Sequence, residues 1–247
     1  IMPGQLIGRL ALVTGAGSGI GRATCKILAR DGAQVIAVDR SLQAAEETLT
    51  KIRADNGGNA AFEADISCVE SVQTMLNQSI EKFKRPPSIV VNSAGITKDN
   101  YLLRMAAVDF DSVINTNLKG TWAILRLVGL SMAEYKVSGS IVNISSISAH
   151  NGNIGQSNYA ASKGGVESLT KVAAREFGKF NIRVNAVIPG YIETPMTDSV
   201  PDNVKQAVLE RCAMKRLGRP EEVAEVISFL ASDKSSYVNG ACVEVSG

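Results

Sequence analysis

The chain has 247 residues, of which 45% are hydrophobic and 20% charged, enough apolar material for one large core. Its 26 basic and 24 acidic residues are dispersed, with no run of like charges that would indicate a nucleic-acid or membrane-surface partner, and no apolar stretch reaches the length of a membrane span. The four cysteines lie far apart without C-x-x-C spacing and the single histidine belongs to no ligand cluster, so we expect neither disulfides nor a metal site.

Seven short runs rich in β-branched residues predict strands, and most are separated by a stretch with helical periodicity. In chain order the predicted strands are 10–14, 34–39, 60–65, 88–92, 140–145, 183–188 and 241–245. The predicted helices are 21–30, 42–53, 70–83, 109–132, 159–177 and 221–231. This alternation favours right-handed β-α-β crossovers and therefore an α/β fold, with a doubly wound, mostly parallel seven-stranded sheet of the Rossmann type.

We expect residues 1–247 to form a single domain, because no linker or internal repeat interrupts the alternation. The one departure is residues 191–217, which read as helical but strand-free and are punctuated by Pro195 and Pro201. This segment follows the sixth predicted strand, and ligands in such folds bind beyond the carboxyl ends of the strands. We therefore expect residues 191–217 to be a small helical lid over a substrate.

A glycine-rich sequence joins the first predicted strand to the first helix. It reads Thr14-Gly15-Ala16-Gly17-Ser18-Gly19-Ile20-Gly21. Glycines there let the backbone approach a pyrophosphate, which the positive end of the following helix would bind. A tight strand-to-helix turn needs glycine for its own sake, so this pattern alone leaves a structural turn and a dinucleotide site both open.

An acidic residue strengthens the dinucleotide interpretation. Asp39 ends the second predicted strand, eighteen residues after Gly21, close to the spacing at which a carboxylate meets the adenosine ribose hydroxyls. A carboxylate accepts hydrogen bonds from a 2′-hydroxyl and repels a 2′-phosphate, which favours NAD over NADP. The neighbouring Arg40 is either a surface arginine along the adenine or, less in keeping with Asp39, a phosphate ligand.

Further motifs resemble one known family, the short-chain dehydrogenases/reductases. They are the glycine-rich sequence, Asn92-Ser93-Ala94-Gly95, Asn117, Ser146, Tyr159-x-x-x-Lys163 and Pro189-Gly190, and they span nearly the whole chain. Within the family, stretches 85–91 and 152–159 are similar to the subfamily of estradiol 17-beta-dehydrogenase type 8 and the 3-oxoacyl-acyl-carrier-protein reductases. Ser93 stands where most relatives have a second asparagine, a departure that concerns a hydrogen bond between sheet and helix.

The resemblance implies an NAD(H)-dependent oxidoreductase and a set of residues that contact the cofactor. That set is Gly15, Gly17, Ser18, Gly19, Ile20, Gly21, Asp39, Arg40, Asp65, Ile66, Asn92, Ala94, Gly95, Tyr159, Lys163, Pro189, Gly190, Ile192 and Thr194. Alternatives remain for two places. Ser67, beside Asp65, is a plausible helix N-cap, and the segment after Pro189 could be an ordinary turn at a strand end.

Tyr159 and Lys163 lie four residues apart in a predicted helix, so their side chains share one face. A phenol would need its pKa lowered by about three units, or roughly 4 kcal/mol, to act as a base at neutral pH. A cation about 4 Å away can supply on the order of 4 kcal/mol at an effective dielectric near 20. We therefore expect Lys163 to make Tyr159 acidic. The resemblance assigns Tyr159 the acid/base role and Lys163 a second one, a hydrogen bond to the nicotinamide ribose.

Two more side chains complete the expected catalytic group. Ser146 matches the family's serine that orients the substrate oxygen, so Ser146 and Tyr159 are the expected substrate-binding pair, with Ser145 as a structural neighbour. The resemblance implies that Asn117 holds a water behind Lys163, although a buried asparagine that satisfies a helix bulge is an equally physical interpretation. His150 is expected in a loop, with no catalytic role.

The resemblance implies 3-oxoacyl or 3-hydroxyacyl thioesters of fatty-acid metabolism as substrates. Two alternatives are a main activity on 17-beta-hydroxysteroids and an NAD-binding, non-catalytic subunit of a hetero-oligomer. Val137 and Phe180 occupy the positions of two carrier-docking arginines, which flanking Lys136 and Lys179 could compensate. Relatives suggest a homotetramer, or a heterotetramer with a related reductase subunit, built on helices 109–132 and 159–177. By resemblance we expect the mitochondrial matrix in a eukaryote, and otherwise the cytoplasm.

Overall fold

The computed structural model describes residues 5–52, 58–198, 200 and 202–247. Its centre is a seven-stranded sheet in the order β3-β2-β1-β4-β5-β6-β7, and every pairing is parallel. The strands are β1 (Leu10–Thr14), β2 (Gln34–Asp39), β3 (Ala60–Glu63), β4 (Ile89–Asn92), β5 (Gly139–Ile144), β6 (Ile182–Pro189) and β7 (Cys242–Val245). The predicted doubly wound Rossmann fold is therefore confirmed.

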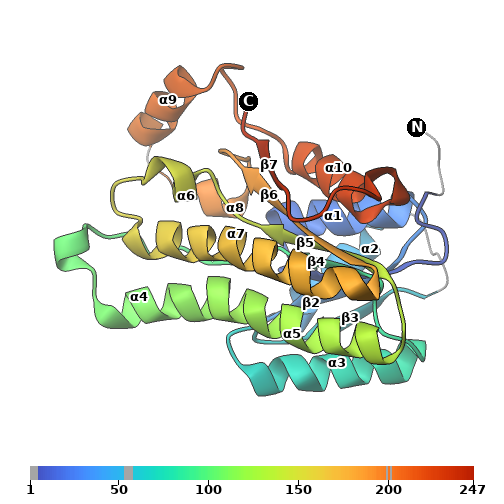
Figure 1. Cartoon of the computed structure of the whole chain (residues 1–247). Helices are drawn as coiled ribbons and strands as arrows, with labels where there is room; N and C mark the ends of the chain where they lie inside the picture. Colours follow the sequence, from blue (N-terminus) through green and yellow to red (C-terminus); the bar gives the residue numbers. More distant parts are fainter. Residues whose placement is uncertain (1–4, 53–57, 199, 201) are drawn as a thin grey trace.

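Helices cover both faces of the sheet (Figure 1). One face carries α1 (Gly19–Arg30), α2 (Leu42–Thr50) and α10 (Pro220–Ala231). The other carries α3 (Val69–Phe83), α4 (Ala107–Val113), α5 (Gly120–Glu134) and α7 (Ser157–Phe177). Short elements complete the described chain: α6 (Ser148–Asn151), α8 (Pro195–Asp198), α9 (Asp202–Arg211) and 3-10 turns at Leu102–Arg104, Gly178–Phe180 and Asp233–Ser235.

Alternate residues of each strand point into two separate cores. On β1, Ala11 and Val13 pack toward α1 and α10, whereas Leu10 and Leu12 pack toward α3 and α5. All five residues of this strand are buried, as expected for a parallel sheet that is covered on both sides. This double burial explains why the strands are continuous apolar runs in the sequence.

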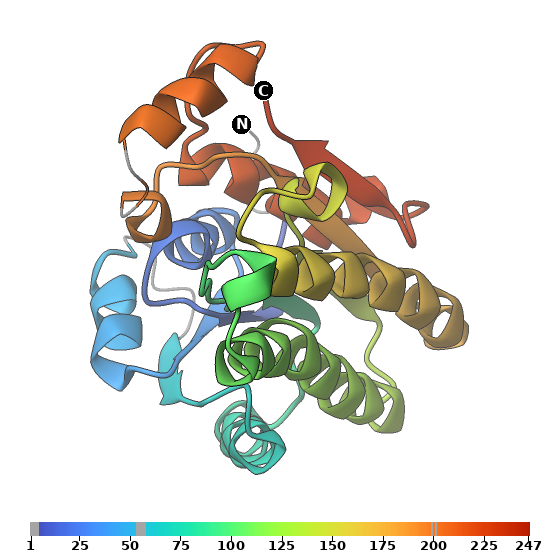
Figure 2. The same ribbon diagram turned by 90° about the vertical axis from the view of Figure 1, so that its left-hand side faces the viewer.

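The predicted helix 109–132 is longer and less regular than expected. It begins with α4, passes through a π-helical segment (Ile114–Lys119) and continues as α5. Figure 2 shows α5 and α7 lying side by side over the sheet. Helix α7 begins at Ser157, one half-turn before the expected start at residue 159, and the predicted helix 42–53 ends at Thr50, with residue 53 outside the described part of the chain.

The chain adds strands β2 and β3 on one side of β1 and strands β4 to β7 on the other side, so the strand order reverses between β1 and β4. Strand β1 pairs with β2 on one side and with β4 on the other, so the connections leave these neighbours toward opposite faces. The carboxyl ends of β1 and β4 therefore border a crevice, the place where ligands bind in open α/β sheets. The expected lid segment, with α8 and α9, lies at the same end of the sheet (Figure 1).

Candidate active site

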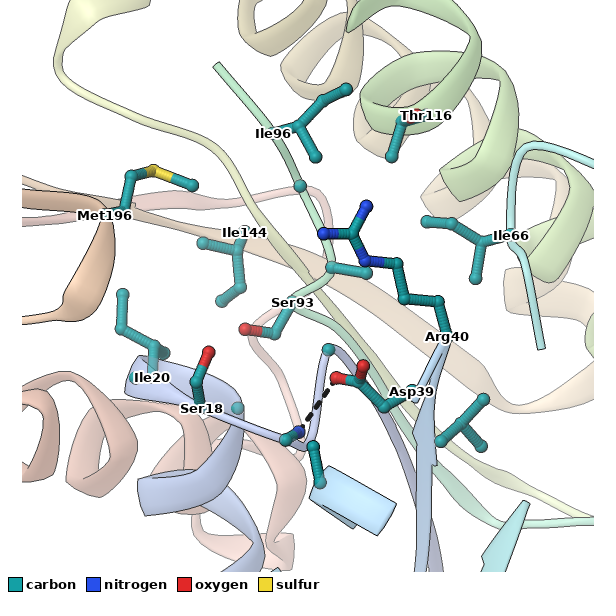
Figure 3. Close-up of a pocket in the computed structure, with 18 of the residues that line it drawn as sticks. Ser18, Ile20, Asp39, Arg40, Ile66, Ser93, Ile96, Thr116, Ile144 and Met196 are labelled. Atoms are coloured by element: carbon teal, nitrogen blue, oxygen red, sulfur yellow. Dashed lines mark hydrogen bonds between the residues drawn. The ribbon is translucent and has the colours of Figure 1, made fainter. Parts of the chain in front are cut away.

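A cavity of about 530 Å³ opens at this crevice (Figure 3). Most of the residues predicted to contact a cofactor line it: Gly15, Gly17, Ser18, Gly19, Ile20, Gly21, Asp39, Arg40, Asp65, Ile66, Ala94, Gly95, Tyr159, Lys163 and Thr194. These residues come from the ends of β1, β2, β3 and β4, from α7 and from the start of the lid segment. The topology thus brings together side chains and glycines that are spread over 180 residues of sequence.

The glycine-rich loop has the shape of an anion cradle. Gly15 has φ +66°, and a Cβ atom there would lie 2.7 Å from the Ala94 Cα, so only glycine fits. Helix α1 begins at Gly19; its N-cap Ser18 makes no side-chain capping bond and no acidic residue occupies the first turn. No acidic side chain of the first turn therefore competes for the amides at this positive helix end, which suits the binding of a pyrophosphate.

Asp39 is held at the end of β2 against the same loop. Its carboxylate accepts hydrogen bonds from the Gly17 amide at 2.9 Å and the Ser41 amide at 3.1 Å, and the first of these is the dashed line in Figure 3. The adjacent Arg40 also lines the cavity, and Figure 3 shows its guanidinium group reaching across the opening. A negative and a positive group thus stand side by side where an adenosine ribose would lie.

Two further predicted positions, Asp65 after β3 and Asn92 at the end of β4, hold the neighbouring backbone and sheet in place. Asp65 accepts bonds from the amide and hydroxyl of Ser67, and Cys68 is the N-cap of α3, so the N-cap interpretation of Ser67 is wrong. Asn92, although predicted to contact the cofactor, is buried and does not line the cavity, and its amide donates to Asn143 at 2.8 Å. Asn143 in turn donates to Thr170 of α7, so the sheet and the helix are joined by a hydrogen bond even though the chain has Ser93.

A second cavity, of about 540 Å³, lies beside the first and shares Tyr159, Ile20, Ile144, Thr194 and Met196 with it. Predicted residues in its wall are Ser146, Tyr159, Pro189, Gly190, Ile192 and Thr194. Tyr191, Met196, Thr197, Val200 and Val204 also line it, and they belong to the segment 191–217 that was expected to cover a substrate. The side chains that the sequence analysis missed are the apolar Ile144, Ile147 and Ile154 and the polar Thr97, Asp99, Ser148 and Gln156. The lid segment contributes much of the apolar wall.

The phenol of Tyr159 stands where the two cavities meet. Burial raises its pKa to about 12, a hydrogen bond with Ser146 opposes this rise, and the carboxylate of Asp99 adds to it. The expectation that Lys163 makes Tyr159 acidic is therefore wrong. Desolvation disfavours the phenolate, and the ammonium of Lys163 donates to the Ile144 carbonyl at 2.7 Å instead of to the phenol.

Lys163 lies one helical turn after Tyr159 and its side chain is buried. Its Nζ is 5.6 Å from the centroid of the Tyr159 ring, so the two groups share the cleft as expected. Burial lowers the pKa of this amine to about 8, because the charged form loses its hydration. A Cβ at Gly95 would lie 3.6 Å from Nζ, which shows how closely the cavity wall fits this group.

Asn117 lies in the π-helical segment and is almost completely buried. Its side chain accepts from the Ile96 amide at 2.9 Å and donates to the Ile96 carbonyl at 3.0 Å and to Ser162 at 3.1 Å. The carbonyl of Asn117 itself accepts from the Thr121 hydroxyl at 2.7 Å. Thus Thr121, rather than the asparagine side chain, satisfies the bulge, and Asn117 fixes the loop after β4 beside Lys163.

The two serines after β5 point in different directions. Ser146 lines the second cavity with Tyr159, and its hydroxyl accepts from the Ser148 amide at 3.2 Å. Ser145 also borders this cavity, but its hydroxyl donates to Glu167 of α7 at 2.7 Å. His150, expected in a loop, lies in the short helix α6 and contacts the other oxygen of Glu167 at 2.9 Å. The helix was missed because it has only four residues.

Part of what the sequence analysis missed carried a detectable signal. Ser93, Ile96 and Thr116 line the first cavity, and they adjoin motif positions that had been singled out. Asp99 and Gln156 bond each other at 2.9 Å across the second cavity although they are 57 residues apart, and only the fold brings them together. Among the described residues there is no cluster of three or more metal-binding side chains, and no helix in that part of the chain could cross a membrane.

Comparisons with known proteins agree with this geometry. A family model described as enoyl-(acyl carrier protein) reductase matches residues 15–247. The (3R)-3-hydroxyacyl-CoA dehydrogenase of Homo sapiens is 48% identical over 250 residues, which cover 98% of this chain and 96% of that protein. The chain belongs to the short-chain dehydrogenase/reductase family.

Two further relatives extend the comparison within the short-chain dehydrogenases/reductases. The 3-oxoacyl-[acyl-carrier-protein] reductase FabG of Thermotoga maritima is 43% identical over 243 residues and covers 98% of both chains. A solved short-chain type dehydrogenase/reductase from Mycobacterium marinum superposes with a TM-score of 0.93 at 32% identity, covering 98% of this chain and 95% of that one. This chain is accordingly an oxidoreductase of a family that uses a nicotinamide cofactor.

Proposed function

We propose that this enzyme interconverts 3-oxoacyl and 3-hydroxyacyl thioesters of fatty-acid metabolism with NAD(H), and that Tyr159 is its acid/base. The observation that carries the proposal is the position of the Tyr159 phenol: it lies at the junction of the two cavities, is hydrogen-bonded with Ser146 and has Lys163 one turn away. One cavity is lined by the glycine-rich loop and fits a dinucleotide, and the other is apolar enough for an acyl chain.

In the reducing direction, the neutral phenol of Tyr159 donates its proton to the carbonyl oxygen as that oxygen gains negative charge. A pKa of about 12 keeps the phenol protonated at neutral pH and ready to act as an acid. Ser146 donates a hydrogen bond to the same oxygen and stabilises the developing charge. The tyrosinate is then reprotonated along the Lys163 side, where Asn117 holds the adjoining loop in place.

The residues around the first cavity suit a dinucleotide. A nicotinamide dinucleotide bound there would supply the hydride for reduction. The glycine-rich loop and the start of α1 would bind its pyrophosphate, Asp39 the adenosine ribose, and Lys163 the nicotinamide ribose. We propose NAD(H) over NADP(H), because the carboxylate of Asp39, fixed by the Gly17 amide, would repel a 2′-phosphate; Arg40 is then a neighbour of the adenine.

The substrate proposal rests on the second cavity and on the names of the relatives. Two relatives are named for 3-hydroxyacyl and 3-oxoacyl substrates. In this chain Ile154, Met196 and Val204 present apolar surface beside Ser146 and Tyr159, which suits an acyl chain behind the reacting carbonyl. We propose residues 191–217 as the lid that covers this chain, and residues 1–247 as one catalytic domain.

We also propose an oligomer built on α4, α5 and α7. Trp122, Leu130 and Val172 are large apolar side chains that these helices leave 41%, 52% and 52% exposed. Such faces are typical of subunit interfaces. Phe180 occupies an expected carrier-docking position, and the Lys179 ammonium lies 5.0 Å from the centroid of its ring. We propose that Lys179, or a related subunit, supplies the basic surface there. The mitochondrial or cytoplasmic location remains a prediction.

Two assays test the substrate proposal. One follows NADH consumption with an acetoacetyl thioester, and the other follows NAD reduction with estradiol, on the same preparation. We expect the thioester to be turned over with the higher kcat/KM. A higher kcat/KM for estradiol would establish the steroid dehydrogenase alternative instead, and tight NADH binding without turnover in either assay would indicate the non-catalytic subunit.

A further inference from the structure

Helix α7 carries a buried carboxylate that the proposed reaction does not use. Glu167 lies one turn after Lys163, and the residue is only 9% exposed. A carboxylate inside a protein is costly unless hydrogen bonds or a cation compensate the loss of hydration. Glu167 therefore requires partners, and their positions indicate what it does.

Each carboxylate oxygen of Glu167 contacts a different segment. Oε1 accepts from the Ser145 hydroxyl at 2.7 Å, and Oε2 lies 2.9 Å from Nε2 of His150. Ser145 stands in the turn after β5, and its hydroxyl also lies 3.2 Å from the Lys163 carbonyl. His150 stands in α6. Glu167 thus ties the turn after β5 and the following helix to α7.

The tied segment carries Ser146. That residue directly follows Ser145, and its hydroxyl accepts from the amide of Ser148 at the start of α6. Ser146 is thus held on one side by a neighbour that Glu167 binds and on the other by a helix that Glu167 binds through His150. Tyr159 and Lys163 are on α7 itself, so the two halves of the catalytic group meet through this carboxylate.

We propose that Glu167 is a positioning residue. It sets the distance between Ser146 and the Tyr159 phenol by anchoring the turn after β5 and helix α6 to α7, the helix that carries the tyrosine. This inference rests on the proposed function. The other titratable groups beside Glu167 are the Cys242 thiol of β7, whose pKa burial raises with a smaller contribution from Glu167, and Lys171 one turn further along α7. Within the described part of the chain neither of them hydrogen-bonds to the turn after β5, so Glu167 reaches the catalytic turn through Ser145 and His150.

The test compares variants of the full-length enzyme by kcat, KM and NADH affinity, each expressed per NADH-binding site. Glu167→Leu removes both contacts, and we expect kcat to fall about 10- to 100-fold while the dissociation constant of NADH stays within about twofold, because only the reacting geometry changes. Glu167→Gln keeps an acceptor for Ser145 and a polar partner for His150, and should recover kcat to within about threefold of wild type. Glu176→Gln, on the exposed side of the same helix, is the matched control.

Ser145→Ala provides a second path if Glu167→Leu does not fold. It removes the single hydroxyl that joins the turn to Glu167, and kcat should fall about three- to tenfold with NADH affinity unchanged. A merely structural carboxylate would change the melting temperature and the number of active sites without changing kcat per site. Wild-type kcat in Glu167→Leu or Ser145→Ala, or a Gln variant as slow as the Leu variant, would overturn the proposal.

A failure of the substrate proposal can be distinguished from a failure of the proposal for Glu167. If the wild-type enzyme does not reduce the acetoacetyl thioester, the substrate proposal is wrong, and the same variants are compared with estradiol and NAD or with the carbonyl compound that wild type does reduce. The expected loss of kcat with retained NADH affinity is the same for each, because it concerns Ser146 and Tyr159 and not the acyl chain.

Discussion

Lys163→Met replaces a buried ammonium with an apolar side chain of similar length, and it should make the protein more stable while it removes activity. The ammonium is compensated by one hydrogen bond, to the Ile144 carbonyl, and burial lowers its pKa from 10.5 to about 8. A pKa depressed in the folded state means that folding disfavours the charged form, so the group destabilises the protein wherever it is protonated.

The size of the effect follows from that shift. At about 1.4 kcal/mol per unit, the charged side chain costs the folded state about 3 kcal/mol at neutral pH. Loss of the hydrogen bond to the Ile144 carbonyl costs about 1–2 kcal/mol and so offsets part of the stabilisation gained by removing the charge. The net stabilisation of about 1–2 kcal/mol corresponds to a rise of about 2–4 °C in melting temperature for a chain of this length.

The pH dependence provides the sharper check. The penalty is present in full below about pH 8 and disappears as the pH approaches 10.5, because the lysine of the unfolded chain then loses its proton as well. Thermal and urea unfolding of both proteins, at equal protein concentration, should show a gap that narrows over this interval. A variant less stable than wild type at neutral pH, or a gap that does not change with pH, would refute the reasoning.

Three further predictions concern the cofactor loop and the phenol. Gly21→Ala puts a Cβ against the Gly15 carbonyl oxygen, so it should destabilise the fold by about 1–3 kcal/mol and weaken NADH binding in fluorescence titrations. Gly164→Ala, where a Cβ would meet open space on α7, should do neither. NADH should exceed NADPH in kcat/KM by about tenfold or more, and Asp39→Asn should narrow that ratio; an unchanged ratio would count against the carboxylate as the selector. Asp99→Asn removes a charge that raises the pKa of Tyr159, so the pH above which the reduction rate falls should be lower in this variant than in wild type. An unchanged or higher value of that pH would contradict this.

Much of the fold could be read from the sequence because local pattern and tertiary burial agree. Strands such as β1 are apolar at every position since both faces of a parallel sheet are covered. The glycine-rich loop was recognisable because the backbone itself demands glycine, as at Gly15. The four-residue spacing of Tyr159 and Lys163 likewise fixed their common side of α7.

What could not be read depends on packing between distant segments. The sign of the pKa shift of Tyr159 was predicted wrongly because a spacing gives the distance to Lys163 but says nothing of the desolvation that surrounding elements impose. Glu167 and Ser145 are 22 residues apart and meet only when α7 packs beside β5. The π-helical turn at Asn117 is a tertiary feature as well, since Thr121 and the loop at Ile96 satisfy its polar groups.

The most direct test of the account is the pair of measurements on Tyr159→Phe. The substitution removes one oxygen from the junction of the two cavities and leaves the ring in place. We expect NADH to bind with its wild-type dissociation constant while carbonyl reduction falls at least about 100-fold, the contribution of a positioned proton donor. Turnover close to that of wild type would contradict the assignment of Tyr159 as the acid on which the proposed mechanism depends.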